Sequence, residues 1–217
     1  MIRDFLLMLA LLGFALAPSS QAQERRDVAG RFDYYLLSLS WSPSYCAEFG
    51  GRDPVQCGRD MRFAFVVHGL WPQHEQGWPS SCKTTFARDV PPALKQSMLD
   101  IMPSPRLVEH EWDKHGVCSG LSPQAYFAMT RRARDRVVIP ATFERLDRTR
   151  MVTGHEVETA FIVANPALKR DMIAVQCDRA RLREVRICMT KSGAFRSCGR
   201  DVQDRCGPER VAMAPVR

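Results

Sequence analysis

The chain has 217 residues, of which 31 are Lys or Arg and 24 are Asp or Glu, so its formal net charge is +7. Because 45% of the residues are hydrophobic, the chain can bury a core of ordinary size, which excludes a wholly disordered protein. Its length favours a single domain. The positive charge is compatible with a polyanionic partner, but charge alone does not indicate nucleic acid.

The N-terminus has the pattern of a secretory signal peptide. Arg3 precedes an apolar run over residues 5–17, and Ser20-Gln21-Ala22 has the small residues of a cleavage site. A membrane anchor is the alternative, but the run of ~13 residues is shorter than the roughly 20 that a spanning helix needs. We therefore expect cleavage after Ala22, no membrane anchor afterwards, and one domain over residues 23–217 that is periplasmic or secreted.

Eight cysteines, an even number, indicate disulfide bonds in an exported chain. No Cys-x-x-Cys pair occurs and the spacings are wide, so a structural zinc site is the weaker interpretation. Spacing alone leaves about 105 pairings open. The cysteines are Cys46, Cys57, Cys82, Cys118, Cys177, Cys188, Cys198 and Cys206.

Two strands are predicted in the first part of the exported chain. Residues 32–41 are aromatic and partly alternating, and this strand ends at Ser42-Pro43. Residues 46–60 contain Gly and Asp at intervals typical of a loop. Residues 63–67 form an apolar run too short for a helix, so a buried strand is expected there. It would deliver residues 68–72 at its end, where the backbone must turn.

The rest of the chain predicts helices followed by strands. Proline or a capping residue marks the start of several helices, which we expect at residues 92–101, 107–115, 123–136 and 153–163. Strands are expected at residues 172–177 and 182–187, with a turn at residues 191–193. Helices and strands are segregated, which indicates a single α+β domain: a central antiparallel sheet flanked by helices and stabilised by disulfides.

Residues 107–115 concentrate ionisable groups on one predicted helix. Glu111 and His115 lie four residues apart, as do His110 and Lys114, and residues at this spacing stack on one side of a helix. The two stacks are about 100° apart, so the four polar groups share a sector. A core helix carries aliphatic side chains there, so this sector is a candidate site.

Two kinds of chemistry fit these residues. A His-Glu-x-x-His zinc site is disfavoured because His110 and His115 are five residues apart and diverge by about 140°. Acid–base cleavage of a phosphodiester needs an acid and a base, and histidine serves as either, with a reference pKa of about 6.5. His68 supplies another histidine, Lys114 and protonated His110 supply cations for phosphate, and Trp71 offers an aromatic face for a base.

Four segments resemble the ribonuclease T2 family. Residues 65–72 (Phe-Val-Val-His-Gly-Leu-Trp-Pro) and 110–118 (His-Glu-Trp-Asp-Lys-His-Gly-Val-Cys) look like the two active-site segments of that family. Residues 34–46 resemble its first strand, and residues 182–188 resemble a strand near its C-terminus. The resemblance covers most of the exported chain, in the family's order, and is greatest to the bacterial periplasmic, ribonuclease I-like branch.

The resemblance implies an α+β endoribonuclease of broad base preference that takes RNA as substrate and needs no metal or other cofactor. Attack by the 2′-hydroxyl would give a 2′,3′-cyclic phosphate, so DNA would be bound but not cut. By motif position, His68 would be the general acid and His115 the general base. Glu111 and Lys114 would stabilise the charged transition state, and His110 would hold phosphate. We also expect a monomer.

The same resemblance implies the disulfide pairing. Cys82 and Cys118 would tie the loop after the first motif to the end of the second. The remaining pairs would be Cys46–Cys57, Cys177–Cys206 and Cys188–Cys198.

Two questions stay open at the level of sequence. Gln73 stands where some family members have an acidic residue, so the base preference of those members is not transferred. The rival function is a secreted protein that keeps the fold but only binds RNA or a partner protein. Such a protein would be expected to have lost a catalytic histidine, and none is lost here.

Overall fold

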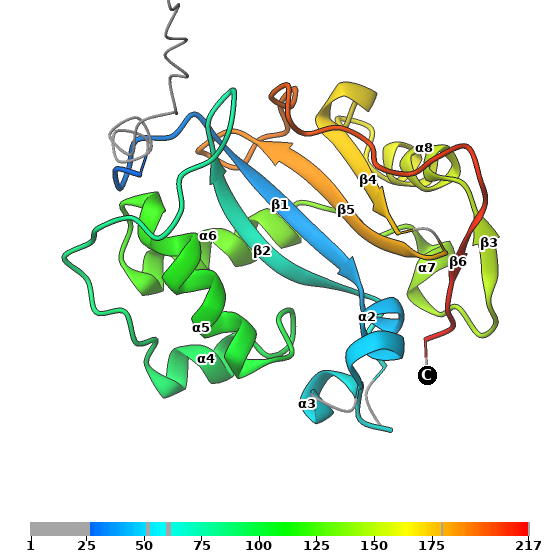
Figure 1. Ribbon diagram of the computed structural model, residues 1–217, viewed down its shortest axis with the longest axis horizontal. Helices are drawn as coiled ribbons and strands as arrows, with labels where there is room; N and C mark the ends of the chain where they lie inside the picture. Colours follow the sequence, from blue (N-terminus) through cyan, green and yellow to red (C-terminus); the bar gives the residue numbers. More distant parts are fainter. Residues whose placement is uncertain (1–26, 51–52, 60–61, 179, 217) are drawn as a thin grey trace, which may run out of the picture.

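The computed structural model describes residues 27–50, 53–59, 62–178 and 180–216 (Figure 1). The predicted signal peptide, residues 1–22, lies outside the described residues. Within the described ranges, no helix combines the length and the apolar character needed to cross a membrane.

A four-stranded antiparallel sheet forms the centre of the fold, in the order β2-β1-β5-β4. The strands β1 (Tyr34–Trp41) and β2 (Phe65–Gln73) come early in the chain, whereas β4 (Ile173–Cys177) and β5 (Leu182–Met189) come late. The sheet therefore places segments from the two ends of the described chain side by side (Figure 1). This arrangement confirms the predicted α+β class with a central antiparallel sheet.

The two faces of the sheet differ because side chains alternate along each strand. On β1, one face carries large buried apolar residues that join the main core: Tyr35, Leu37, Leu39 and Trp41. The opposite face of β1 carries Tyr34 and Leu36, and then the small side chains of Ser38 and Ser40. We call the first the core face and the second the site face.

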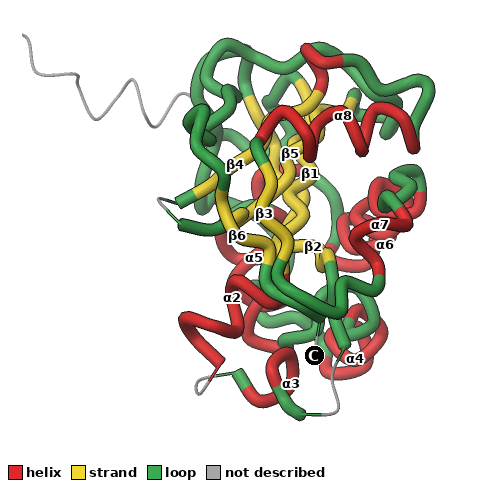
Figure 2. Tube along the Cα trace, turned by 90° about the vertical axis from the view of Figure 1, so that its right-hand side faces the viewer, coloured by secondary structure: helices red, strands yellow, loops and turns green. Residues whose placement is uncertain are grey.

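Helices cover the core face and the β2 edge of the sheet. The helices α6 (Pro123–Asp135), α7 (Ala141–Glu144) and α8 (Gly154–Ala164) contribute side chains to the core, and they lie on the same side of the strands in Figure 2. The helices α4 (Pro92–Met98) and α5 (Pro105–Lys114) lie beside the edge strand β2 (Figure 1). Shorter elements complete the described fold: the 3-10 turns η2 (Gly116–Ser119) and η3 (Arg170–Met172), and a two-stranded sheet of β3 (Arg150–Val152) and β6 (Val211–Met213).

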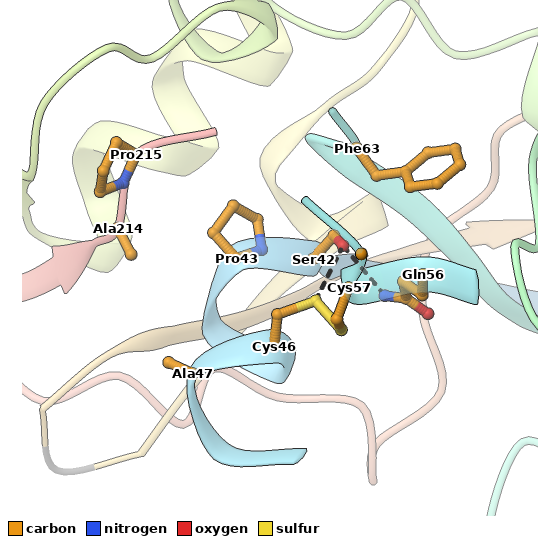
Figure 3. Close-up of a pocket in the computed structure, with 10 residues that line it drawn as sticks. Ser42, Pro43, Cys46, Ala47, Gln56, Cys57, Phe63, Ala214 and Pro215 are labelled. Atoms are coloured by element: carbon orange, nitrogen blue, oxygen red, sulfur yellow. Dashed lines mark hydrogen bonds between the residues drawn. A yellow bond between two sulfur atoms is a disulfide. The ribbon is translucent and has the colours of Figure 1, made fainter. Parts of the chain in front are cut away.

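Residues 46–60 do not form the predicted loop throughout. Instead α2 (Ser42–Phe49) begins directly after β1, and α3 (Pro54–Cys57) follows. The prediction was wrong because contacts distant in sequence hold both short helices: Cys46 bonds Cys57, and Gln56 Nε2 donates to Ser42 Oγ at 3.0 Å. These side chains line a small pocket of about 230 Å³ (Figure 3).

The eight cysteines form four disulfides in the pairing that the resemblance implied. They are Cys46–Cys57, Cys82–Cys118, Cys177–Cys206 and Cys188–Cys198. Cys82–Cys118 joins the segment after β2 to η2, directly beyond α5, so it fixes the end of that helix relative to β2.

Candidate active site

His68 lies in the middle of β2, at an irregularity in its pairing with β1. Ser38 pairs with Gly69 and Leu39 pairs with Val67, so His68 is an extra residue without a partner. Such a β-bulge redirects side chains and is frequent next to active sites. The prediction that the backbone turns after residue 67 was wrong, because β2 continues to residue 73.

The bulge decides which side chains reach the site face. His68 and Trp71 are three residues apart, so in a regular strand they would point to opposite faces. With one extra residue between Val67 and Gly69, Val67 and Leu70 both enter the core, and the rings of His68 and Trp71 meet at 5.2 Å between centroids. The bulge thus brings both predicted site residues of this strand together.

Two residues of β5 complete this face, and sequence reasoning missed both of them. Glu184 pairs with Ser40 and Arg186 pairs with Ser38. Because serine side chains are small, Glu184 reaches across β1, and its Oε1 lies 2.6 Å from Nδ1 of His68. The available signal was the spacing: a Glu and an Arg two residues apart on a predicted strand must share a face.

The helix α5 brings Glu111 to the same place. Val108 and Trp112, four residues apart, are fully buried in the core and fix the rotation of the helix. Glu111 is then 1% exposed, and its Oε2 accepts a hydrogen bond of 2.6 Å from Nε1 of Trp71. Its Oε1 lies 3.7 Å from Nε2 of His68. The two motifs therefore meet through a buried carboxylate.

His115 ends α5 and lies against Trp71. The two rings stack at 5.2 Å with an interplanar angle of 28°. The backbone carbonyl of His115 accepts a hydrogen bond from the amide of Cys118, so the Cys82–Cys118 disulfide is tied to the backbone of this histidine. Within the described part of the chain, its buried Nδ1 has no hydrogen-bond partner.

Burial and neighbouring charges drive the pKa values of the two histidines apart. Burial and the positive charge of Lys114 lower the pKa of His115 to about 3, so this imidazole is neutral at neutral pH. Burial alone would also lower the pKa of His68. However, the hydrogen bond to Glu184 and the charges of Glu111 and Glu184 outweigh burial and raise it. His68 thus favours the protonated form, and His115 the neutral form.

Burial also shifts the pKa of Glu111, in the direction expected for a carboxyl group. Burial raises it to about 7, against the opposing effects of His68, the Trp71 hydrogen bond and Lys114. Near neutral pH this carboxyl is therefore divided between its protonated and ionised forms. A buried carboxyl of this kind can donate a hydrogen bond as well as accept one.

His110 and Lys114 are exposed on α5. Burial, Lys114 and His68 together lower the pKa of His110. His110 and His68 both line a groove of about 760 Å³ between α2, α3 and the start of α5. The groove offers the aromatic rings of Tyr45 and Phe49 and the cations of two arginines, Arg106 and Arg183. Within the described ranges, no group of three or more His, Cys, Asp or Glu residues lies where it could hold a metal ion.

The sequence and the fold have counterparts among known proteins. The sequence profile of the ribonuclease T2 family matches residues 32–198. A "Ribonuclease" of Aeromonas hydrophila is 35% identical over an alignment of 231 positions that covers 97% of this chain and 99% of the relative.

Two solved structures show the same fold. A mutant of RNase MC1 in complex with 5′-UMP superposes with a TM-score of 0.66 at 20% identity, covering 83% of this chain and 97% of that one. RNase NT in complex with 5′-AMP gives a TM-score of 0.65 at 21% identity, covering 85% of this chain and 98% of that one.

The fold and the matched profile define the class of the protein: it is an endoribonuclease, an enzyme that cleaves RNA. More narrowly, the chain belongs to the ribonuclease T2 family. The bacterial source of the Aeromonas relative agrees with the branch that the sequence resembled.

Proposed function

We propose that this enzyme cleaves RNA by intramolecular attack of the 2′-hydroxyl, with His115 as general base and His68 as general acid. Neutral His115 takes the proton of the 2′-hydroxyl as its oxygen bonds to phosphorus. Protonated His68 gives a proton to the 5′-oxygen as the bond between that oxygen and phosphorus breaks. The products are a 2′,3′-cyclic phosphate and a free 5′-hydroxyl. The observation that carries this assignment is the opposite direction of the two histidine pKa shifts at rings that both contact Trp71.

Glu111, Lys114 and His110 complete the proposed machinery. The protonated form of Glu111 can donate a hydrogen bond to a phosphoryl oxygen as negative charge develops there. Lys114 adds a positive charge close enough to influence the pKa values of Glu111, His110 and His115. His110 lines the groove beside His68, which supports a contact between His110 and the phosphate.

The proposed substrate is single-stranded RNA of broad base composition. The groove beside His68 has room for a nucleoside, and its aromatic and cationic lining suits a base and a neighbouring phosphate. Two structural neighbours were solved with 5′-UMP and 5′-AMP, which supports nucleotide binding on this fold. DNA lacks the attacking 2′-hydroxyl, so it should bind without being cut.

We further propose that the mature enzyme is a monomer and that it is exported after cleavage at Ala22. The signal-peptide pattern of residues 1–22 supports export, and four disulfides suit an oxidising compartment. Mass spectrometry of protein from a periplasmic fraction should find an N-terminus at Gln23. An intact N-terminus at Met1 would contradict export.

An RNA zymogram run with and without EDTA tests the reaction. We expect a cleared band under both conditions, with His68→Ala and His115→Ala each losing nearly all activity while remaining folded by circular dichroism. A band that EDTA removes would favour metal-dependent cleavage. A folded wild-type protein that retains RNA in a gel shift but clears no band would favour the binding protein.

A further inference from the structure

Glu184 contacts one of the two ring nitrogens of His68. Its Oε1 lies 2.6 Å from Nδ1, and Ser40 Oγ donates to the same oxygen at 3.4 Å. The other ring nitrogen, Nε2, faces Glu111 at 3.7 Å. Since Nδ1 is engaged from behind by β5, Nε2 is the nitrogen left to meet a substrate.

Arg186 holds the second oxygen of Glu184. Its Nε and Nη2 donate to Oε2 at 3.0 Å and 2.8 Å, so Oε1 remains for His68. Burial opposes ionisation of Glu184, but the hydrogen bond and charge of His68 and the charge of Arg186 lower its pKa to about 2. The guanidinium also lies 5.2 Å from the centre of the Trp71 ring. The carboxylate is therefore charged and fixed in orientation before substrate arrives.

We propose that Glu184, held by Arg186, is a positioning residue that keeps the Nδ1 proton of His68 in place and makes Nε2 the proton donor to the leaving 5′-oxygen. When the Nε2–H bond breaks, its proton passes to that oxygen, and the remaining proton stays on Nδ1, hydrogen-bonded to Glu184. A carboxylate at one imidazole nitrogen fixes which nitrogen reacts and stabilises the charged ring. This inference rests on the proposed role of His68 as general acid.

Among the residues that the structure describes, the charged and titratable groups that act on His68 are Glu184 and Arg186 from β5, and Glu111, His110 and His115 from α5 and its end. Of these groups, Glu184 alone is within hydrogen-bond distance of the ring. Removing its charge should therefore have the largest effect on the proton of His68.

The test compares two substrates that differ in their need for an acid. The dinucleoside phosphate UpA has a poor leaving oxygen, whereas uridine 3′-(4-nitrophenyl phosphate) releases a stable phenolate without protonation. In Glu184→Gln we expect kcat/KM on UpA at neutral pH to fall about tenfold to hundredfold, and kcat/KM on the nitrophenyl ester to change by no more than about threefold. Glu144→Gln, which removes the same charge from an exposed position on α7, should behave as wild type on both substrates. An equal loss on both substrates in Glu184→Gln would overturn the inference.

The pH dependence of kcat/KM tests the direction in which each group shifts the pKa of His68. The alkaline limb of kcat/KM reports the pKa of the acid. Glu184→Gln should move this limb to lower pH, because burial then lowers the pKa of His68 with less opposition. Arg186→Met should move it to higher pH, because the charge of Arg186 lowers the pKa of His68 in the intact protein. In NMR titrations, the pH midpoints of the His68 ring resonances should shift in the same two directions.

Three further results distinguish a failure of the role of Glu184 from a failure of the proposed function. If Glu184→Gln does not fold, the two-substrate comparison is made in Arg186→Met, which frees Glu184, and an equal loss on both substrates there overturns the inference. In a His68→Ala background, Glu184→Gln should cause no further loss on UpA, whereas an additional loss would show that Glu184 does not act through His68. If folded wild-type enzyme cleaves neither substrate, the proposed function fails, whatever Glu184 contributes to the fold.

Discussion

Replacing Gly69 by alanine should damage the site directly, because the glycine leaves space that Glu111 and Trp71 fill. A Cβ atom at residue 69 would lie 1.9 Å from Oε2 of Glu111 and 2.3 Å from Nε1 of Trp71. These are the two atoms of the hydrogen bond that joins the motifs. To reach ordinary contact near 3.4 Å, the carboxylate oxygen would have to move by about 1.5 Å.

The magnitude follows from that displacement. Loss of a hydrogen bond to a buried charged group costs about 1.5–3 kcal/mol, and overpacking adds about 1–3 kcal/mol. Moving a catalytic group by about 1 Å can cost about 100-fold in rate. We therefore expect Gly69→Ala to lower the free energy of unfolding by about 3 kcal/mol and to lower kcat/KM on UpA by about 100-fold or more.

Urea unfolding and steady-state kinetics measure the two effects. Gly207→Ala is the matched control, because a Cβ there meets no atom within 4 Å, and it should change neither quantity. If Gly69→Ala keeps the unfolding free energy and the kcat/KM of the control, Glu111 does not occupy the place that the structure gives it.

Three further predictions concern the buried groups and the disulfide beside them. Because burial raises the pKa of Glu111 to about 7, the free energy of unfolding should fall by about 3 kcal/mol as pH rises from about 4.5 to 7. Glu111→Gln should therefore be more stable than wild type in urea unfolding at pH 8, although nearly inactive. Equal stability of the two proteins at pH 8 would contradict the raised pKa. Because the pKa of His115 is lowered to about 3, kcat/KM should show no loss of its base between pH 7 and pH 5, and an acid limb near 6.5 would contradict this shift. The double variant Cys82→Ala, Cys118→Ala opens a loop of 36 residues and should lose about 4 kcal/mol of unfolding free energy, whereas a loss below about 1 kcal/mol would show that the disulfide adds little.

The sequence identified most of the local structure and the site residues of the two motifs, but not Glu184 and Arg186. Alternation and, for β2, a short apolar run located the central strands, and capping residues located α6 and α8. The spacing of Glu111 and His115 predicted one helix sector, since i, i+4 neighbours must lie together on any helix. One error was the turn expected after residue 67, where β2 instead continues to residue 73. The others were α2 and α3, which are too short to be stable by propensity alone and depend on the Cys46–Cys57 disulfide and packing.

What the sequence determined by itself is therefore part of the inventory of the site: the histidines, the carboxylate on the helix, and an even set of cysteines. The tertiary structure decided how they act. The bulge at His68 depends on the pairing of β2 with β1, so no local pattern reveals it. Glu184 comes from a strand 116 residues away, and its contact exists only because the small Ser38 and Ser40 lie between the two strands. The difference in pKa between His68 and His115 likewise arises from burial and from charges that the fold brings together, and it supports the proposed roles that the resemblance alone had implied.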